Sequence, residues 1–183
     1  MKIAIISDVH DNIPNLKKVL DYCASKKIGK IICCGDLASI ETLDFLNDNF
    51  EGEIYFTFGN MDNDYLQKYH FKNKEFRKTK IFKKEGEIEI EGPASTRKDD
   101  CSSTRGGKKI AFVHFPKIAK GLCRSGRYDF VFYGHMHKPW EEAIDNCKML
   151  NPGNVAGQFF PATFAVWNTD VDKFELVRID QLR

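Results

Sequence analysis

The amino-acid sequence predicts an α/β fold with two β-sheets, and two observations indicate it. Through the first 58 residues, short apolar runs alternate with amphipathic segments in the order strand, helix, strand, helix, strand. Such alternation, with continuously apolar strands, is typical of a parallel sheet that is covered on both faces. Beyond residue 61 the sequence changes to short segments in which apolar and polar residues alternate, and these predict strands of a second sheet.

The N-terminal part shows its elements most clearly. Pro14 fits the first turn of a helix, and apolar residues such as Leu16, Leu20 and Cys23 follow it at helical spacing. The predicted strands cover residues 2–7, 30–34 and 53–58, and the predicted helices cover residues 13–26 and 39–48.

The rest of the chain is predicted to contain a short helix, a hairpin, a loop and further strands. The helix is expected over 62–69, and the segments 79–84 and 86–91 alternate like a hairpin around Glu85 and Gly86. Residues 92–107 have the composition of a loop. Strands over 109–114 and 129–134 flank a helix near 116–125, and antiparallel strands are expected over 141–146, 162–168 and 173–179.

Length and composition limit the class of protein. A chain of 183 residues with 42% apolar content suits a single domain over residues 1–183. No stretch approaches the roughly 20 apolar residues that span a bilayer, and the apolar start meets Asp8 too soon for a signal peptide. We therefore expect a cytoplasmic protein without a membrane partner. The six cysteines include no Cys-x-x-Cys pair, so we expect reduced cysteines that act as small packing residues.

Polar residues that can bind metals follow five of the predicted strands. Ligands in open α/β sheets gather beyond the carboxyl ends of the strands, so these side chains are expected to share one site. The candidate metal ligands are Asp8, His10, Asp36, Asn60, His114, His135 and His137.

The number and spacing of these residues favour two cations over one. Asp8 and His10 lie two residues apart, as do His135 and His137, so each pair can face the same side of an extended segment. Seven donors exceed what one tetrahedral zinc needs, and they suit two cations roughly 3.5–4 Å apart that share a bridging carboxylate. Each short motif alone has an ordinary structural explanation, such as a helix cap or a turn. Taken together, four of the five histidines would have to occupy matching positions by accident.

The ordered motifs resemble those of the calcineurin-like metallophosphoesterase superfamily, and their order and the chain length resemble its small phosphodiesterase branch in bacteria and archaea. The motifs that carry this resemblance are Asp8-Val9-His10, Gly35-Asp36, Gly59-Asn60-Met61-Asp62, His114 and Gly134-His135-Met136-His137. The resemblance implies a β-sandwich of two sheets flanked by helices, in four layers of the αββα type. It also implies a metal-dependent phosphodiesterase that hydrolyses small phosphodiesters.

The resemblance assigns the ligands to two metal ions. Asp8, His10, Asp36 and His137 would hold one of them. Asp36, Asn60, His114 and His135 would hold the other, with Asp36 as the bridge. A hydroxide that bridges the two metals would attack phosphorus in line with the leaving oxygen. Mixed imidazole and carboxylate ligands favour manganese, iron, zinc or nickel over calcium.

The sequence departs from the family pattern at Met61. Many relatives have a histidine directly after the motif asparagine, where it is thought to protonate the leaving group. Methionine cannot transfer a proton, and losing a general acid typically costs about 10²–10⁴-fold in rate. We therefore expect a preference for activated leaving groups, and we expect Asp62 to orient a ligand or its loop.

Two alternatives remain open from the sequence. A small retromer subunit shares the fold but has eroded metal ligands, so a non-catalytic scaffold for protein interaction is one of them. A metal-dependent nuclease is the other. Basic residues between Lys68 and Lys84, and between Arg97 and Lys109, would suit nucleic acid, but a solvated face explains them as well. The residues permit a homodimer without requiring one.

Overall fold

The protein is described from a computed structural model, which covers residues 1–62, 66, 78–91 and 107–182. A six-stranded sheet contains β1 (Lys2–Ile6), β2 (Lys30–Cys33), β3 (Glu53–Thr57), β4 (Thr79–Phe82), β10 (Thr163–Asn168) and β11 (Lys173–Arg178), in the order β11-β10-β1-β2-β3-β4. Strands β1 to β4 run parallel, whereas β10 and β11 are antiparallel to their neighbours.

A five-stranded sheet holds the remaining strands. They are β5 (Gly86–Ile90), β6 (Lys108–Val113), β7 (Phe130–Tyr133), β8 (Trp140–Ile144) and β9 (Cys147–Asn151), in the order β5-β6-β7-β9-β8. The three central strands are parallel, and the edge strands β5 and β8 are antiparallel.

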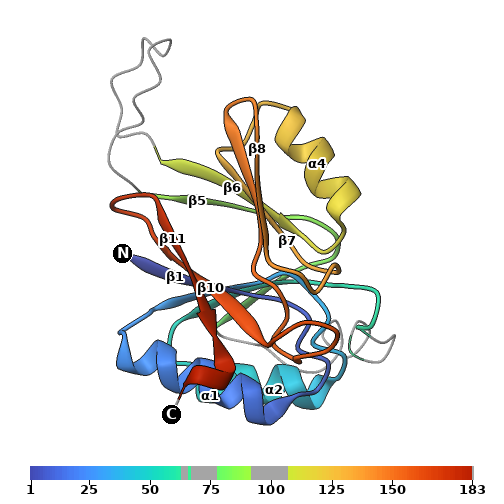
Figure 1. Cartoon of the computed structure of the whole chain (residues 1–183), viewed down its shortest axis with the longest axis vertical. Coiled ribbons are helices and arrows are strands. Elements are labelled where there is room, and N and C mark those ends of the chain that lie inside the picture. Colours follow the sequence, from blue (N-terminus) through green and yellow to red (C-terminus); the bar gives the residue numbers. More distant parts are fainter. Residues whose placement is uncertain (63–65, 67–77, 92–106, 183) are drawn as a thin grey trace.

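The helices flank the two sheets on their outer faces (Figure 1). The helices are α1 (Ile13–Ser25), α2 (Ile40–Asn49) and α4 (Pro116–Arg124), and a 3₁₀ turn η1 (Ile179–Gln181) follows β11. Helices α1 and α2 cover the six-stranded sheet, and α4 contacts β6, β7 and β9 of the other sheet. The molecule therefore has the four layers αββα that the family resemblance implied, and this prediction of the fold class is confirmed.

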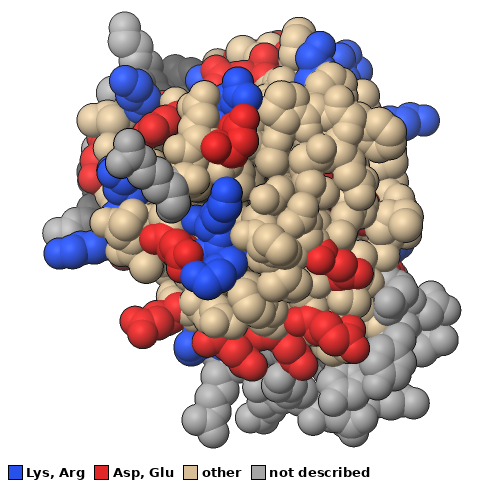
Figure 2. Space-filling model, turned by 60° about the horizontal axis from the view of Figure 1, so that its bottom comes forward, with Lys and Arg blue, Asp and Glu red and all other residues tan. Residues whose placement is uncertain are grey.

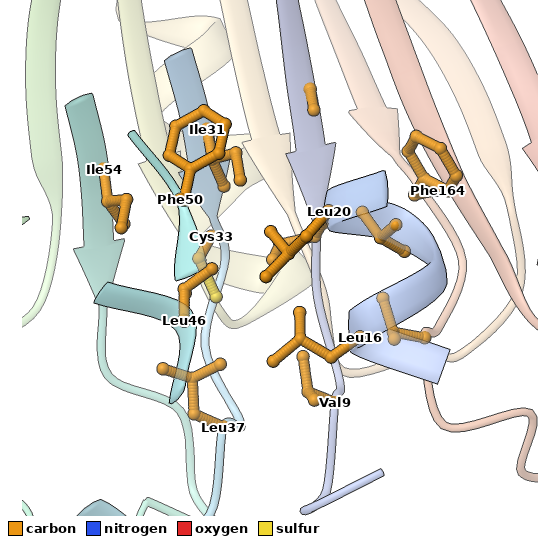
Figure 3. Packing of buried hydrophobic residues seen from close by; sticks show 14 of the residues in the cluster. Val9, Leu16, Leu20, Ile31, Cys33, Leu37, Leu46, Phe50, Ile54 and Phe164 are labelled. Atoms are coloured by element: carbon orange, nitrogen blue, oxygen red, sulfur yellow. The ribbon is translucent and has the colours of Figure 1, made fainter. Parts of the chain in front are cut away.

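The alternation of side chains along β1 explains the continuous apolar strands. Ala4 and Ile6 belong to the core beneath α1 and α2, whereas Ile3 and Ile5 belong to the core between the sheets. Because successive side chains of a strand point to opposite faces, a strand buried on both faces must be apolar throughout. Figure 3 shows the helix-side core. Its labelled side chains are Val9, Leu16, Leu20, Ile31, Cys33, Leu37, Leu46, Phe50, Ile54 and Phe164.

The predicted hairpin over 79–91 is wrong. Strand β4 pairs in parallel with β3, whereas β5 pairs antiparallel with β6 in the other sheet. Residues 83–85 therefore carry the chain from one sheet to the other. Period-two alternation marks a strand without marking its partner, so the sequence pattern could not separate these two arrangements.

The strands after residue 140 also differ from expectation. Strand β9 lies between the predicted strands 141–146 and 162–168, where no strand was predicted, and it runs parallel to β7. Strands β10 and β11 join the first sheet, not the second. The expected helix over 62–69 and the loop over 92–107 lie almost wholly outside the described residues.

The expectation of uniformly reduced cysteines is wrong for one pair. Cys123 at the end of α4 forms a disulfide with Cys147 at the start of β9. Only the packing of α4 against β9 brings these two residues together across 24 positions of sequence. Cys23, Cys33 and Cys34 are free and buried, as expected of packing residues. Among the described residues, no helix is both long and apolar enough to cross a membrane.

Candidate metal centre

All seven candidate ligands meet where the two sheets end. Asp8, His10, Asp36 and Asn60 follow β1, β2 and β3 of the six-stranded sheet. His114, His135 and His137 follow β6 and β7 of the five-stranded sheet. The two sheets therefore supply complementary parts of one site, and neither sheet holds all of them.

The first group joins Asp8, His10 and His137. The Nε2 atoms of His10 and His137 lie 3.2 Å apart. Asp8 Oδ1 lies 3.4 Å from Nε2 of His137 and 3.8 Å from Nε2 of His10. Three donors from two strand ends thus face a common point.

The second group surrounds His114. Its Nε2 lies 3.2 Å from Asp36 Oδ2 and 2.9 Å from Asn60 Oδ1. The same oxygen of Asn60 lies 2.9 Å from His135 Nδ1. Asp36 Oδ2 also lies 3.8 Å from Nε2 of His10, which belongs to the first group. Asp36 therefore stands between the two groups, at the place expected of a bridging carboxylate.

Asp8 also reaches both groups, because its carboxylate belongs to a second cluster with Asp36 and His114. Its two oxygens accept the backbone N–H of His135, at 3.2 and 3.1 Å. Asp8 thus orients the loop that follows β7 in addition to facing the histidines.

The backbone of the site is unusual. Asp8, His10, Asp36, His135 and His137 all have positive φ angles between 44° and 69°. Non-glycine residues seldom adopt this left-handed conformation, and such residues cluster at functional sites. The strained turns are held by neighbouring backbone groups, since Val9 N–H and His10 N–H both donate to the carbonyl of Asp36.

Asp62 ties the loops after β2 and β3 together. Its buried carboxylate accepts backbone N–H groups from Asp36 at 2.9 Å, from Ala38 at 2.9 Å and from Gly59 at 2.6 Å. Asp62 thus orients the loop of a candidate ligand, as the sequence predicted. Gly59 allows the close approach, because a Cβ at this position would lie 2.2 Å from Asp36 Oδ1.

The charges in the site are buried and are balanced mainly by histidine. Burial raises the pKa of Asp8, and His114 and His137 oppose that rise. Burial also acts on Asp36, but His114, the N–H of Met61 and His10 outweigh it and lower the pKa of this carboxyl. Burial would lower the pKa of His114, yet the contacts with Asp36 and Asp8 raise it.

The donor set fits divalent cations. Nδ1 of His114 lies 2.9 Å from the carbonyl of Cys34, which can only accept, so this nitrogen carries the ring proton. When the ring is neutral, its Nε2 presents a lone pair to the oxygens of Asp36 and Asn60, and a cation would satisfy all three. A backbone carbonyl that orients a ligating histidine in this way is common around metals.

Sequence reasoning missed several residues that shape the site. The buried Asn154 donates from Nδ2 to the carbonyl of His137. Asn151 donates in the same way to the carbonyl of Gly134. Phe159, not singled out from the sequence, packs against the ring of His137, with centroids 5.6 Å apart. No local pattern marks these residues, because each contact joins segments that are distant in sequence.

Comparison with known proteins identifies relatives of this arrangement. Residues 1–173 match the calcineurin-like phosphoesterase superfamily domain. Phosphodiesterase MJ0936 of Methanocaldococcus jannaschii is 31% identical over 157 residues, which are 86% of each chain. The solved structure of an archaeal phosphodiesterase has a TM-score of 0.77 and 26% identity, and covers 97% of this chain and 99% of its own.

More distant structures share the fold. Vps29 of Entamoeba histolytica, solved in complex with Zn²⁺, has a TM-score of 0.60 at 18% identity and covers 98% of this chain and 99% of its own. The match over residues 1–173 and the shared fold lead to one conclusion. The chain belongs to the calcineurin-like phosphoesterase superfamily.

Proposed function

We propose that the protein is a binuclear metal-dependent phosphodiesterase that hydrolyses small phosphodiesters. The convergence of seven oxygen and nitrogen donors in two groups, with Asp36 between them, carries this proposal. Similarity to Phosphodiesterase MJ0936 and to the solved archaeal phosphodiesterase structure supports a diester over a monoester. We further propose that residues 1–183 act as one domain, since both sheets supply ligands.

Each cation would have its own set of ligands. Asp8, His10 and His137 would hold the first, and Asn60, His114 and His135 would hold the second, with Asp36 shared between them. Two divalent cations, when bound, would supply an activated water nucleophile and offset negative charge on the phosphoryl oxygens. Manganese, iron, zinc and nickel all suit these imidazole and carboxylate ligands.

The chain's own groups prepare the site for this chemistry. Cys34 fixes the orientation of the His114 ring through its carbonyl. Asp62 holds the backbone of Asp36, and the Met61 N–H donates to Asp36 Oδ1 at 2.7 Å. These contacts orient the bridging carboxylate before substrate arrives, which reduces the reorganisation needed during the reaction.

The position after Asn60, where many relatives have a histidine to protonate the leaving group, holds a methionine. The side chain of Met61 is 53% exposed next to Asn60, and its thioether has no proton to donate. Activated leaving groups, which depart as stable anions, do not need such a proton. A preference for aryl esters over alkyl esters is therefore part of the proposal.

Two basic residues from the segments that would suit nucleic acid already have acidic partners in the structure. Lys80 lies 3.9 Å from Glu53, and Lys108 pairs with Asp172. Strand β4, which carries Lys80, is an edge strand of its sheet, where lysine protects against pairing with other chains. Figure 2 shows acidic and basic side chains interspersed on the face in view. The cytoplasmic location and a homodimer stay predictions.

The test is hydrolysis of bis-p-nitrophenyl phosphate beside p-nitrophenyl phosphate, after chelator treatment and addition of manganese, nickel, zinc or magnesium. We expect metal-dependent cleavage with the diester preferred. Asp36→Asn should abolish it while a cooperative urea-unfolding transition shows that the protein stays folded, and the exposed Asp21→Asn serves as the matched control. Metal binding without hydrolysis of either ester would instead favour the non-catalytic scaffold.

A further inference from the structure

Phe159 is an exposed aromatic residue at the edge of the candidate metal centre. Its side chain is 90% exposed, so it contributes little to the core. Its ring lies 5.6 Å from the ring of His137, a candidate ligand, with an interplanar angle of 58°. A single exposed phenylalanine is ordinary in itself. Phe159 differs from such a residue in its backbone conformation and in the hydrogen bonds that hold its segment to the metal centre.

The backbone at Phe159 is strained. Its φ angle is +62°, and the N–H of Phe160 donates to the carbonyl of Gln158 at 2.7 Å. These features describe a γ-turn with a positive central φ, which is rare and strained. A bulky residue in this conformation is an outlier. Because the ring is almost fully exposed, it buries too little surface to offset the strain.

The segment that carries Phe159 is tied to the metal centre. The buried side chain of Asn154 accepts from the N–H of Gln158 at 2.9 Å and donates to the carbonyl of His137 at 2.9 Å. The N–H of Ala156 donates to the carbonyl of Asp8 at 3.0 Å. The turn is therefore positioned by the same residues that position two candidate ligands.

Phe115, a second aromatic side chain against the ligands among the described residues, has a different environment. It is 37% exposed, and its ring packs edge-on against both His114 and His135, about 5 Å away. It thus supports the ligand rings from beside them. Phe159 contacts one histidine and leaves most of its ring open, so a planar group can lie on it.

We propose that Phe159 is a specificity residue that stacks on a planar aromatic ester group of the substrate. This proposal rests on the proposed phosphodiesterase function and deepens it by naming the substrate class: phosphodiesters with an aryl or nucleoside substituent. A phosphoryl group held at the cations would place its ester substituents beside His137, within reach of this ring. Stacking on an aromatic side chain tolerates different bases and aryl groups, because each has a π face.

The test measures the binding of two phosphonates that cannot be hydrolysed as esters. Phenylphosphonate and methylphosphonate are titrated by calorimetry into the manganese-loaded protein, and the ratio of their dissociation constants isolates the aromatic ring. We expect phenylphosphonate to bind more tightly to wild type. Phe159→Ala should reduce this preference by at least about 5-fold, which is about 1 kcal/mol and the lower end of measured stacking effects. The preference of Phe159→Leu for phenylphosphonate should lie between those of wild type and Phe159→Ala.

Leu176→Ala is the control, because Leu176 is a half-exposed apolar residue on β11 and should leave the preference unchanged. An unchanged preference in Phe159→Ala would overturn the proposal. Equal weakening of both ligands would also overturn it, because Phe159 would then act by supporting His137. Hydrolysis of bis-p-nitrophenyl phosphate by the wild-type protein distinguishes failure of the stacking role from failure of the proposed function. If wild type is active and Phe159→Ala keeps the preference for phenylphosphonate, only the stacking role is refuted. Absence of both binding and hydrolysis with every metal refutes the proposed function too.

Discussion

Replacing Asp62 with asparagine tests whether the metal centre is positioned by a residue that is not itself a candidate ligand. Oδ2 of Asp62 accepts from Asp36 and Gly59, and Oδ1 accepts from Ala38. Asparagine has nearly the same size but replaces one acceptor oxygen with an amide NH₂. At least one of the three backbone N–H groups must then face another donor.

The expected loss of stability follows from these contacts. One buried N–H without a partner costs about 1–3 kcal/mol, and two bonds lose the extra strength that a charged acceptor provides. Burial raises the pKa of Asp62 more than its three N–H donors lower it, so the charged carboxylate is itself costly to bury. Removing this charge therefore offsets part of the lost stability. We therefore expect Asp62→Asn to lower the free energy of unfolding by about 2–4 kcal/mol. Metal affinity should fall about 10–100-fold, as is typical when a residue that orients a ligand is changed.

Urea unfolding of the chelator-treated protein measures the first effect, and calorimetric titration with manganese measures the second. Asp21→Asn is the matched control, because Asp21 is exposed and pairs only with Lys17 four residues away on α1 among the described residues. Such a pair contributes about 0.5 kcal/mol or less. If Asp62→Asn unfolds like this control and binds manganese as tightly as wild type, Asp62 does not position the site.

Three further changes probe other features. Gly59→Ala places a Cβ 2.2 Å from Asp36 Oδ1. We expect it to lower the free energy of unfolding by about 1–3 kcal/mol, measured by urea unfolding, and to weaken manganese binding, measured by titration. Wild-type manganese affinity would contradict this reasoning. Reduction of the Cys123–Cys147 disulfide should lower the free energy of unfolding by about 2–4 kcal/mol, whereas Cys123→Ser should be insensitive to reductant. Met61→His should raise kcat on phenyl esters at least about 10-fold and change nitrophenyl esters little; equal rates would show that leaving-group protonation is not limiting.

The sequence predicted most elements because their signals are local. Strands β1, β2 and β3 and helices α1 and α2 begin and end within about two residues of expectation. Their boundaries depend on periodicity, capping and proline, which act over a few neighbouring residues. Pairing is a longer-range property, so the hairpin over 79–91 was wrong, and the parallel strand β9 was missed. The disulfide was missed for the same reason, since its cysteines meet only after α4 packs on β9.

The candidate site likewise has some features that depend on local sequence and others that depend on tertiary packing. The sequence by itself determined which residues can ligate a metal and that they follow strands, because residue type and strand ends are local. Only the tertiary structure decided that Asp36 lies between two groups, that Asp62 joins two loops, and that Phe159 stands beside His137. The positions of Asp36 and Phe159 depend on how the two sheets pack face to face, and the role of Asp62 depends on the pairing of β2 with β3. Packing of that kind depends on contacts between residues far apart in the chain, which no short stretch of sequence contains.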